Sequence, residues 1–561
     1  MGLSKDTLDR RSFLKGAALV GGTAALTGLV GCEPAEPPEE ESTEPKVEIP
    51  EWMPKWDEST DVVVIGFGGA GLCAAVEAYE QGVDVIVFEK SPIADGGSTG
   101  CSSGSIHTAP KSNPQEWIEK IMRGSFGTVD RPTVEKMVNH AMETPDWFDK
   151  VNIPVEWGAM GNPSVTRPAS STGRIVGYEG NEGRFLWQGL LKGADDRKID
   201  YRLNTPVTEL VQHPFTKEIL GVKIKESGGT GAEKIIKANK GVVMACGGYG
   251  GSPERQYQYN HPGIYLWPWG TPYNEGDGFD FSFSVGADIW HMDGCEYSAV
   301  AFRLASEEAG ASISTDATAG ITPYNHIFVN RQGERFMNEA KSMNHDIESK
   351  PVEDFSASES DFINLPFFMV FDKTMFDAKP LYIGSGRSGI INTYAGVQKL
   401  CDWGPDNAKA LSKGWIFQGD TLEELAAKIK GTTPANVAVN GINAEGLKAS
   451  VASFNKFAET GEDLEFGRAA RNMDTIVTPP FYAIEMTVSN INTQGGARRD
   501  GDCQVLNTKR EKIGRLFSAG EFGSINGFVY VYGNIFEALT SGRVAGHNAA
   551  VLDSWDPDDK Y

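Results

Sequence analysis

The sequence predicts an α/β fold built on a Rossmann-like parallel sheet, because one stretch reads as a strand, a glycine-rich turn, a helix and a second strand. This stretch covers residues 61–90 and reads DVVVIGFGGAGLCAAVEAYEQGVDVIVFEK. Its first apolar run is short and rich in valine and isoleucine, which is typical of a parallel strand covered on both faces. A Gly-x-Gly-x-x-Gly pattern follows directly, and the second apolar run ends at an acidic residue.

The glycine pattern and the acid have spacings that suit a dinucleotide. Gly66 would make the tight turn, Gly68 would let the backbone approach a pyrophosphate, and Gly71 would let the helix pack closely on the strand. The helix N-terminus would then point its unpaired N–H groups at the phosphates. Glu89 follows Gly71 by eighteen residues and could accept both hydroxyls of an adenosine ribose. Ala70 in the turn and Lys90 after the acid complete this predicted site, which does not by itself separate NAD from FAD.

Composition and charge limit the classes of protein and partner. The chain has 561 residues, of which 40% are hydrophobic and 10% aromatic, and this is typical of a globular protein with two or three domains. Its formal net charge is −24. An acidic balance of this size argues against nucleic acid, and against an anionic membrane surface, as a binding partner.

The N-terminus predicts export. Arg10 and Arg11 open the run RRSFLK, and a weakly hydrophobic stretch too short to span a membrane follows, which is typical of a twin-arginine signal peptide over residues 1–31. The sequence LVGC ends at Cys32 and is similar to a bacterial lipobox, in which Cys32 would carry a lipid anchor on the outer face of the cytoplasmic membrane. An ordinary small-residue cleavage site is the alternative. Membrane contact is expected only through the signal or the lipid.

Residues 32–56 are rich in glutamate and proline and predict an extended tether, because they contain too few apolar residues to form a core. Twin-arginine export carries folded proteins, so it also suggests a cofactor loaded before export. No CxxC pair and no CxxCH motif occurs in the sequence. We therefore expect no metal centre, c-type haem or iron–sulfur cluster within the chain. An electron donor would be a separate molecule, for which a cytochrome or a quinol-linked protein is expected.

Three later segments favour FAD over NAD. A loop of small residues contains Ser98, Thr99 and Gly104, whose hydroxyls and backbone amides can meet phosphates or a ring system. Residues 206–211 and 221–224 predict a β-hairpin, and the strand at 241–245 ends in a second glycine turn. The strand at 515–521 ends in glycine and an acid, and Gly533 precedes a helix expected to reach about residue 552. A helix N-terminus at the pyrimidine edge of a flavin would stabilise the reduced ring.

These segments, taken in order, resemble the flavoprotein family of soluble fumarate reductases and 3-ketosteroid dehydrogenases. The quoted motifs include NEGDG at 274–278, NRQGERFMNE at 330–339, PFYA at 480–483, TQGG at 493–496 and AGE at 519–521. The resemblance covers residues 57 to 552. It implies a Rossmann-like FAD-binding domain in two parts, 57–296 and 488–552, with an inserted α+β cap domain at 297–487. Substrate would lie between the cap and the flavin.

The resemblance also implies roles for particular residues. The pyrophosphate, adenosine ribose and phosphate contacts would come from the residues already named for the dinucleotide site and the small-residue loop. The remaining FAD contacts would come from Val207 at the adenine, Ala245 and Gly248 in the second glycine turn, Asp277 near the flavin chain, Glu521 at the ribityl hydroxyls, and Asn534 and Ile535 at the pyrimidine. Cys246 stands where the family more often has threonine.

The sequence departs from the fumarate reductases where they hold the two carboxylates of their substrate. The expected histidine is Asn492, the expected C-terminal arginine is Tyr530, and the expected proton-donating arginine falls near Phe376. A dianion without cationic partners would be severely destabilised in a dry cleft. Fumarate and other small dicarboxylates are therefore poor substrate candidates.

Neutral aromatic residues take the place of that clamp. The expected pocket contains Tyr482, Phe528, Tyr530 and Tyr532, with Trp267, Trp269, Tyr324 and Tyr394 as further candidates. Such a pocket suits an enone or a cinnamate-like or steroid-like skeleton.

Candidate catalytic residues follow from this pocket. Tyr530 is the first candidate for proton transfer, with Tyr482 and Arg387 as further catalytic candidates and Arg303 ranked with Arg387. Packing without a catalytic role is the alternative for both tyrosines. Arg335 and Glu339 are expected to form a buried structural ion pair.

The sequence therefore predicts an exported flavoprotein reductase of the CH–CH class, which transfers hydride from FAD N5 to an activated C=C bond of a mostly neutral, aromatic or cyclic small molecule. Electrons would come from a separate respiratory partner. A ketosteroid-type dehydrogenase acting in the desaturating direction is the first alternative. A surface-anchored flavin electron shuttle without catalytic activity is the second.

Overall fold

The structure is a computed structural model, and it describes most of the chain after its N-terminal segment. The described residues are 52–94, 96–102, 104–159, 171–175, 183–260, 266–268, 271, 273–303, 312–314, 323–341, 352, 354–381, 403–434, 437–527 and 533–555. The predicted signal peptide, Cys32 and most of the predicted tether lie outside these residues. No helix in the described ranges is both long and apolar enough to cross a membrane.

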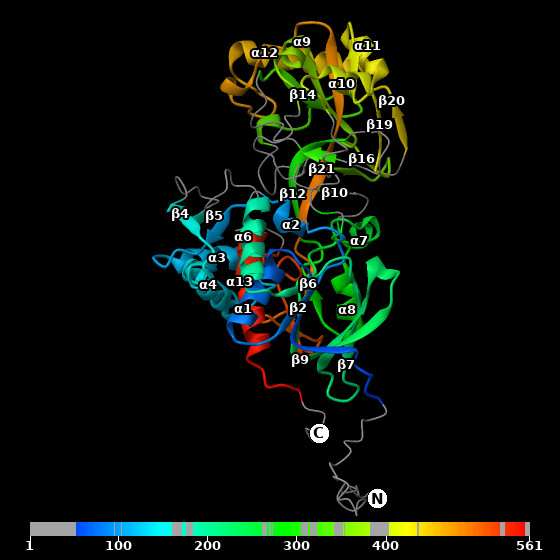
Figure 1. Cartoon of the computed structure of the whole chain (residues 1–561). Coiled ribbons are helices and arrows are strands. Elements are labelled where there is room, and N and C mark those ends of the chain that lie inside the picture. Colours follow the sequence, from blue (N-terminus) through cyan, green and yellow to red (C-terminus); the bar gives the residue numbers. More distant parts are fainter. Residues whose placement is uncertain are drawn as a thin grey trace, which may run out of the picture. The chain divides into compact units, whose positions relative to one another are not determined.

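A mainly parallel sheet forms the first part of the fold (Figure 1). Its strand order is β23–β24–β9–β1–β2–β6, and an antiparallel hairpin of β7 and β8 extends from β9. The strands are β1 Glu58–Ile65, β2 Val85–Phe88, β6 Asp200–Arg202, β7 Val207–Gln212, β8 Ile219–Lys225, β9 Glu233–Met244, β23 Gln504–Leu506 and β24 Lys512–Ser518. The fold class predicted from residues 61–90 is confirmed, with α1 beginning at Gly69 inside the glycine pattern.

Both faces of this sheet are covered, as the apolar first strand predicts. Val62 and Val64 belong to one buried cluster, while Val63 and Ile65 belong to another, because successive side chains of a strand point to opposite faces. The helices of this part are α1 Gly69–Glu80, α2 Gly97–Gly100, α3 Pro114–Gly124, α4 Arg131–Met142, α5 Thr144–Lys150, α6 Gly183–Asp196, α7 Pro253–Tyr259, α8 Asp277–Val285 and α13 Asn534–Ala550.

Helices α1 and α13 pack together at very short range (Figure 1). A Cβ atom at Gly542 would lie 2.4 Å from the carbonyl oxygen of Ala70, and one at Gly546 would lie 2.2 Å from that of Ala74. Glycine at both positions therefore lets the C-terminal helix lie directly against the helix that follows the glycine turn. Helix α1, near the start of the described residues, and helix α13, near their end, therefore belong to one core.

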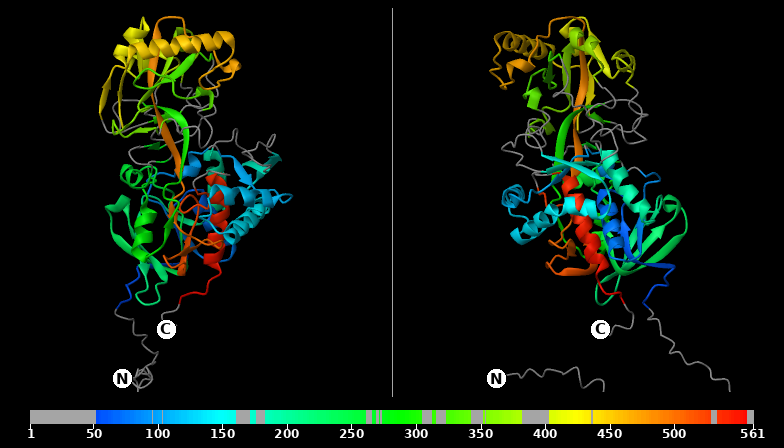
Figure 2. Two further views of the ribbon diagram at one scale, coloured as in Figure 1. Left: turned by 180° about the vertical axis from the view of Figure 1, so that it is seen from behind. Right: turned by 60° about the vertical axis from the view of Figure 1, so that its left-hand side comes forward.

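A second, mostly antiparallel sheet is built around β21, Phe481–Thr493, which is drawn as a long orange strand in both views of Figure 2. β12 and β17 pair along its two edges, β13 and β14 extend the sheet, and β10 and β18 also pair with β21. The bounds are β10 Trp267–Pro268, β12 Cys295–Arg303, β13 Ser312–Ser314, β14 His326–Val329, β17 Phe367–Asp372 and β18 Ile416–Gly419.

Short helices and strands complete the described fold. The helices around the second sheet are α9 Lys373–Ala378, α10 Ala408–Ser412, α11 Leu422–Lys428 and α12 Ala444–Thr460. Small strand pairs and a three-stranded sheet are formed by β3 Ile106–Thr108, β4 Val155–Ala159, β5 Ser171–Ile175, β11 Ile289–Trp290, β15 Phe355–Ser356, β16 Asp361–Phe362, β19 Lys430–Thr432, β20 Ala438–Asn440 and β22 Gly496–Ala497. The domain boundaries at 297 and 487 stay a prediction.

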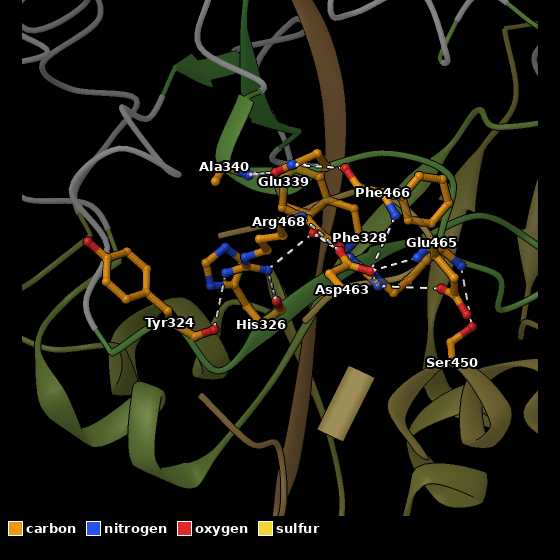
Figure 3. A network of polar contacts seen from close by, with 12 residues as sticks. Tyr324, His326, Phe328, Glu339, Ala340, Ser450, Asp463, Glu465, Phe466 and Arg468 are labelled. Carbon is orange, nitrogen blue, oxygen red and sulfur yellow. Dashed lines mark hydrogen bonds and ion pairs between the residues drawn. The ribbon is translucent and has the colours of Figure 1, made fainter. Parts of the chain in front are cut away.

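A buried network of charges ties β14 to the segment after α12 (Figure 3). Arg335 pairs with Glu339 at 3.0 Å and with Asp463 at 3.0 Å, and Arg468 pairs with Glu339 at 3.2 Å. All four side chains are at most 1% exposed. Arg468 also donates to the carbonyl oxygen of His326. The expected ion pair is thus present, but it is part of a four-residue network with alternating charges.

Replacing Arg335 by methionine should destabilise the protein strongly, because Glu339 and Asp463 would keep their burial and lose their main partner. Breaking a buried ion pair costs about 3–5 kcal/mol. The measurement is the unfolding free energy of the purified holoprotein in urea. Lys373→Met removes a half-exposed partner of Asp377 and is the matched control, for which little change is expected. Equal losses in the two variants would contradict the structural role of the network.

Candidate functional site

The carboxyl ends of β1, β9 and β24 meet at one corner of the parallel sheet. Ala245 donates its N–H to the carbonyl oxygen of Ile65 at 2.9 Å, and Ala519 donates to that of Met244 at 2.9 Å. Gly66 follows β1 with φ of +105°, and a Cβ there would lie 2.3 Å from the carbonyl oxygen of Ala245. Only glycine fits both the backbone conformation and the space. The two glycine turns singled out from the sequence are therefore neighbours.

Helix α1 opens at this corner with its N-terminus available to a ligand. A Cβ at Gly71 would lie 2.0 Å from the carbonyl oxygen of Gly66, so the helix packs against the turn as predicted. Gly68 is the N-cap residue and has no side chain of its own to cap the helix, while the hydroxyl of Thr99 accepts the N–H of Gly69. A Cβ at Gly68 would meet only the carbonyl oxygen of Gly96, at 3.6 Å, so the protein leaves room above this residue. The geometry suits a pyrophosphate bound to the helix N-terminus.

Glu89 is held in a fixed orientation at the end of β2. Its two carboxylate oxygens accept hydrogen bonds from the backbone N–H groups of Phe67 at 2.9 Å and Ser91 at 2.7 Å. Thr205 donates its N–H to the carbonyl oxygen of Glu89, which brings the start of β7, and so Val207, beside this acid. The two residues expected at the adenosine therefore lie on adjacent segments.

Lys90 faces Asp277 and Glu275, with its Nζ 2.6 Å and 2.9 Å from their carboxylates. Burial alone would lower the pKa of Lys90, but the two carboxylates outweigh it and raise the pKa. The ammonium group is therefore fully charged and fixes the N-terminus of α8 next to β2. Lys90 and Asp277, which are both expected at the cofactor, thus form an ion pair with each other.

The small-residue loop connects to the C-terminal acid. Ser98 in α2 donates to Glu521 at 2.9 Å and accepts from the amide of Asn274 at 2.7 Å. Thr99 accepts the N–H of Gly69 at 3.1 Å, which places α2 against the start of α1. Gly104 lies beyond α2 with φ of +72° and donates its N–H to the hydroxyl of Ser102. Segments about 420 residues apart in sequence are thus joined at one site.

Glu521 is buried at this corner and is 6% exposed. Burial raises its pKa to about 7, although hydrogen bonds from Thr493 and Ser98 act in the opposite direction. The Thr493 N–H donates to Glu521 at 2.9 Å. A Cβ at Gly248 would lie 2.1 Å from the Thr493 hydroxyl and 2.3 Å from a Glu521 oxygen, so these three residues are in close contact. A carboxyl in this setting changes its charge near neutral pH.

A buried ion pair braces the segment that carries Glu521. Arg499 pairs with Glu537 in the first turn of α13, and both side chains are 0% exposed. Arg499 also donates to the carbonyl oxygens of Gly520 at 3.3 Å and Phe522 at 3.2 Å. The sequence did not predict this ion pair, because no motif links Arg499 to Glu537. It holds Asn534 and Ile535, at the start of α13, in register with Glu521.

Of the three catalytic candidates, Tyr482 alone lies among the described residues. Tyr530 and Arg387 lie outside the described residues, as do Phe528, Tyr532, Trp269 and Tyr394. Tyr482 is 3% exposed and stacks on Phe376 with ring centroids 4.1 Å apart. It lies eleven residues before Thr493 on β21, and this corresponds to roughly 36 Å along a strand. Tyr482 therefore lies far along β21 from the residues at the cofactor corner, and its catalytic role stays a prediction.

Two further candidates also lie in the second sheet. Arg303 donates to Glu485 at 3.1 Å and to the carbonyl oxygen of Thr432 at 2.9 Å. Burial raises the pKa of Glu485 to about 7, against the opposing effect of Arg303. Tyr324 accepts a hydrogen bond at its carbonyl oxygen from Arg468 and lies beside the charge network (Figure 3). These residues stabilise the second sheet in the described part of the chain.

Comparison with known proteins agrees with the geometry. The sequence model of the FAD binding domain family matches residues 61–534. A digoxin reductase of Eggerthella lenta is 25% identical over 98% of both chains. A fumarate reductase (cytochrome) of Shewanella frigidimarina is 27% identical over 88% of this chain and 77% of its own length. Other relatives include an NADH:acrylate oxidoreductase of Vibrio harveyi and a vinyl phenol reductase of Lactiplantibacillus plantarum.

The solved structures place the fold in the same group. A 3-ketosteroid delta1-dehydrogenase from Sterolibacterium denitrificans superimposes with a TM-score of 0.70 over 88% of this chain and 99% of its own, at 22% identity. The cradle of Gly66, Gly68 and Glu89, together with the buried Glu521, fits the adenosine, pyrophosphate and ribityl groups of FAD. The chain belongs to the FAD binding domain family, and it is an FAD-dependent oxidoreductase of the CH–CH class.

Proposed function

We propose that this protein is an exported reductase that saturates an activated C=C bond of a mostly neutral, aromatic or cyclic small molecule. The single observation that carries the substrate class is the side chain of Asn492, next to Thr493. Thr493 lies against Glu521 and Gly248, so Asn492 lies beside the cofactor residues and presents no cation there. Its side-chain oxygen accepts a hydrogen bond from Gln494 at 2.7 Å. A dicarboxylate would find an uncharged amide at this position.

The reaction is balanced by one hydride and one proton. Bound FAD supplies chemistry in which N5 of the reduced ring gives a hydride to the β-carbon of the alkene and the ring is oxidised. A protein group then gives a proton to the α-carbon, so that the C=C bond becomes a single bond. We keep Tyr530 as the proposed proton donor, since a phenol can protonate the carbon next to a carbonyl.

The electron source and the location belong to the same proposal. The twin-arginine pattern at Arg10 and Arg11 and the lipobox at Cys32 support export and a lipid anchor in the cell envelope. The sequence has no CxxCH haem motif, so a separate cytochrome or quinol-linked protein is proposed to reduce the FAD. The acidic net charge of −24 suits a cationic donor.

Desaturation of a ketosteroid-like substrate remains the second candidate direction. The residue that favoured it, Tyr482, is buried in the second sheet, and its catalytic role stays a prediction. Bleaching of the oxidised flavin by a saturated ketone, without added reductant, would favour this direction over reduction.

Anaerobic reoxidation tests the proposed reductase. Purified holoprotein is reduced with a viologen dye and mixed with fumarate, cinnamate, urocanate, 4-vinylphenol, benzylideneacetone and cyclohexenone, while flavin absorbance is followed. We expect reoxidation by at least one activated alkene and no reoxidation by fumarate. A flavin that no member of the panel reoxidises would contradict the proposal and favour an electron shuttle.

Substitution of Tyr530 by phenylalanine tests the proton donor. Loss of a general acid reduces turnover by about 10²–10⁴-fold. We expect such a fall in kcat for the alkene that the panel identifies, with FAD content unchanged. Unchanged turnover would remove Tyr530 from the mechanism and leave the reductase class standing.

Binding of FAD should depend on the charge of Glu521. Its pKa is raised to about 7, so the carboxyl is protonated below neutrality and becomes a stronger hydrogen-bond acceptor for ribityl hydroxyls as the pH rises. In the unfolded chain this carboxyl loses its proton near pH 4.5, whereas in the folded apoprotein it keeps the proton up to about pH 7. Its contribution to the stability of the folded apoprotein is therefore full below about pH 4.5 and is lost as the pH rises through 7. Rising pH therefore weakens the apoprotein and strengthens its FAD binding.

Titration of apoprotein with FAD between pH 6 and pH 8 measures this effect. The wild-type dissociation constant should fall as the pH rises. In Glu521→Gln the pH dependence should be lost, and binding at pH 8 should weaken by about 10–100-fold, since a charged hydrogen bond contributes about 1.5–3 kcal/mol. Glu521→Gln with the wild-type pH profile would show that another group is responsible.

A further inference from the structure

Four carboxamide side chains gather around the end of β21, beside the FAD residues. We name Asn490, Asn492, Gln494 and Asn526 the amide cluster. Their exposed fractions are 1%, 6%, 1% and 1%, respectively. Gln494 donates to Asn492, and its carbonyl oxygen accepts the N–H of Ser524, which brings the segment of Asn526 next to β21. Buried amides in such number are unusual, because each must satisfy a donor and an acceptor.

Most of the buried polar atoms in this cluster have no partner among the described residues. Both side-chain atoms of Asn490, both of Asn526, and Oε1 of Gln494 make no hydrogen bond within the part of the chain that the structure describes. Leaving one buried polar group unpaired costs about 1–3 kcal/mol. This cluster therefore concentrates unmet hydrogen-bonding capacity beside the FAD residues in the described part of the chain.

The position of the cluster relates it to the reaction site. Asn492 and Gln494 flank Thr493, whose N–H binds Glu521. A Cβ at Gly250, close after the second glycine turn, would lie 3.1 Å from Nδ2 of Asn490. A Cβ at Gly294 would lie 2.8 Å from the carbonyl oxygen of Gly527 and 2.9 Å from Cβ of Gln494, so the Asn526 segment closes on the same point. The amides therefore surround the end of β21 rather than the core of the second sheet.

A buried amide in another part of the fold shows how such a group is normally satisfied. Asn407 is 0% exposed, and its Oδ1 accepts from the N–H of Leu381 at 2.8 Å and from the indole of Trp403 at 3.0 Å. Its Nδ2 donates to the carbonyl oxygens of Phe376 at 2.8 Å and Lys379 at 2.9 Å. Asn407 has a structural role that Asn490 and Asn526 lack.

We propose that Asn490, Gln494 and Asn526 select an uncharged substrate that brings both a carbonyl acceptor and a hydrogen-bond donor to this site. The inference rests on the proposed reductase function and adds the residues that determine its specificity. A carboxamide offers an N–H donor to a carbonyl oxygen and a C=O acceptor to a hydroxyl or amide, and it cannot neutralise a carboxylate. An α,β-unsaturated ketone, lactone or amide with a nearby hydroxyl group has the matching chemistry.

The matched probes are cinnamamide and cinnamate, which share a phenyl ring and an alkene and differ in a carboxamide, with its donor and acceptor, against a carboxylate. Viologen-reduced holoprotein should be reoxidised at least tenfold faster by cinnamamide. Faster reoxidation by cinnamate, or by fumarate, overturns the specificity inference while the reductase function stands. Reoxidation by no alkene of the wider panel overturns the proposed function itself, and failure of cinnamamide alone overturns the inference.

Leucine substitutions separate a binding role from a structural one, since leucine has nearly the shape of asparagine. In Asn490→Leu and Asn526→Leu the thermal unfolding midpoint of the holoprotein should be unchanged or higher, and KM for cinnamamide should rise at least tenfold. Asn407→Leu is the control and should lower the midpoint by several degrees. A loss in the first two variants as large as in Asn407→Leu would show that the amides are structural and would overturn the proposal.

FAD content distinguishes the substrate from the flavin ring, which also presents donors and acceptors. The leucine variants should retain FAD with the wild-type dissociation constant, measured by titration of apoprotein. Loss of FAD in either variant would assign these amides to the cofactor and overturn the proposal. Unchanged KM together with retained FAD would overturn it as well.

Discussion

The close contact between the turn after β1 and the end of β9 determines the rest of the site. A side chain at Gly66 would collide with the carbonyl oxygen of Ala245, and one at Gly71 would collide with the carbonyl oxygen of Gly66. Because these backbones touch, α1 starts directly above the ends of β1 and β9, and β24 aligns with them through Ala519. The two glycine turns assigned to FAD are positioned by this arrangement of strand ends. The close packing of α13 on α1 then fixes the C-terminal acid at the same corner.

Strand β21 serves two structural purposes along its length. Its first half pairs with β17 and β18 and contributes Tyr482 and Ile484 to an aromatic and aliphatic core. Its last residue, Thr493, binds Glu521 at the cofactor corner. Residues on one continuous strand therefore have unrelated roles that depend on their distance from that corner. A motif such as PFYA can mark the start of the strand without marking the reaction site.

The sequence was sufficient to predict that Gly66, Gly68 and Glu89 lie together, because each requirement there is local, and their contacts with FAD stay a prediction. Gly66, Gly68 and Glu89 belong to one strand–turn–helix–strand unit whose spacing has a direct geometric meaning. The Ser98–Glu521 bond could be anticipated only through the family resemblance, since no periodicity links residues so far apart. Arg499 with Glu537, and Arg468 with Glu339, could not be found from the sequence, because a buried ion pair depends on which segments the fold brings together. The burial of Tyr482 against Phe376 could not be predicted for the same reason.

Burial of an uncharged amide and burial of a cation have different consequences for a reductase. An arginine or histidine beside the flavin stabilises a carboxylate substrate but must be paired when that substrate is absent. An asparagine has a smaller desolvation cost, so the unpaired atoms of Asn490 and Asn526 can be tolerated until a ligand binds. The hydrogen bonds that these amides lack are supplied when a ligand brings both a donor and an acceptor, whereas a charged ligand would lose its hydration without receiving a counter-charge. Specificity for a neutral substrate then arises from the penalty imposed on the charged one.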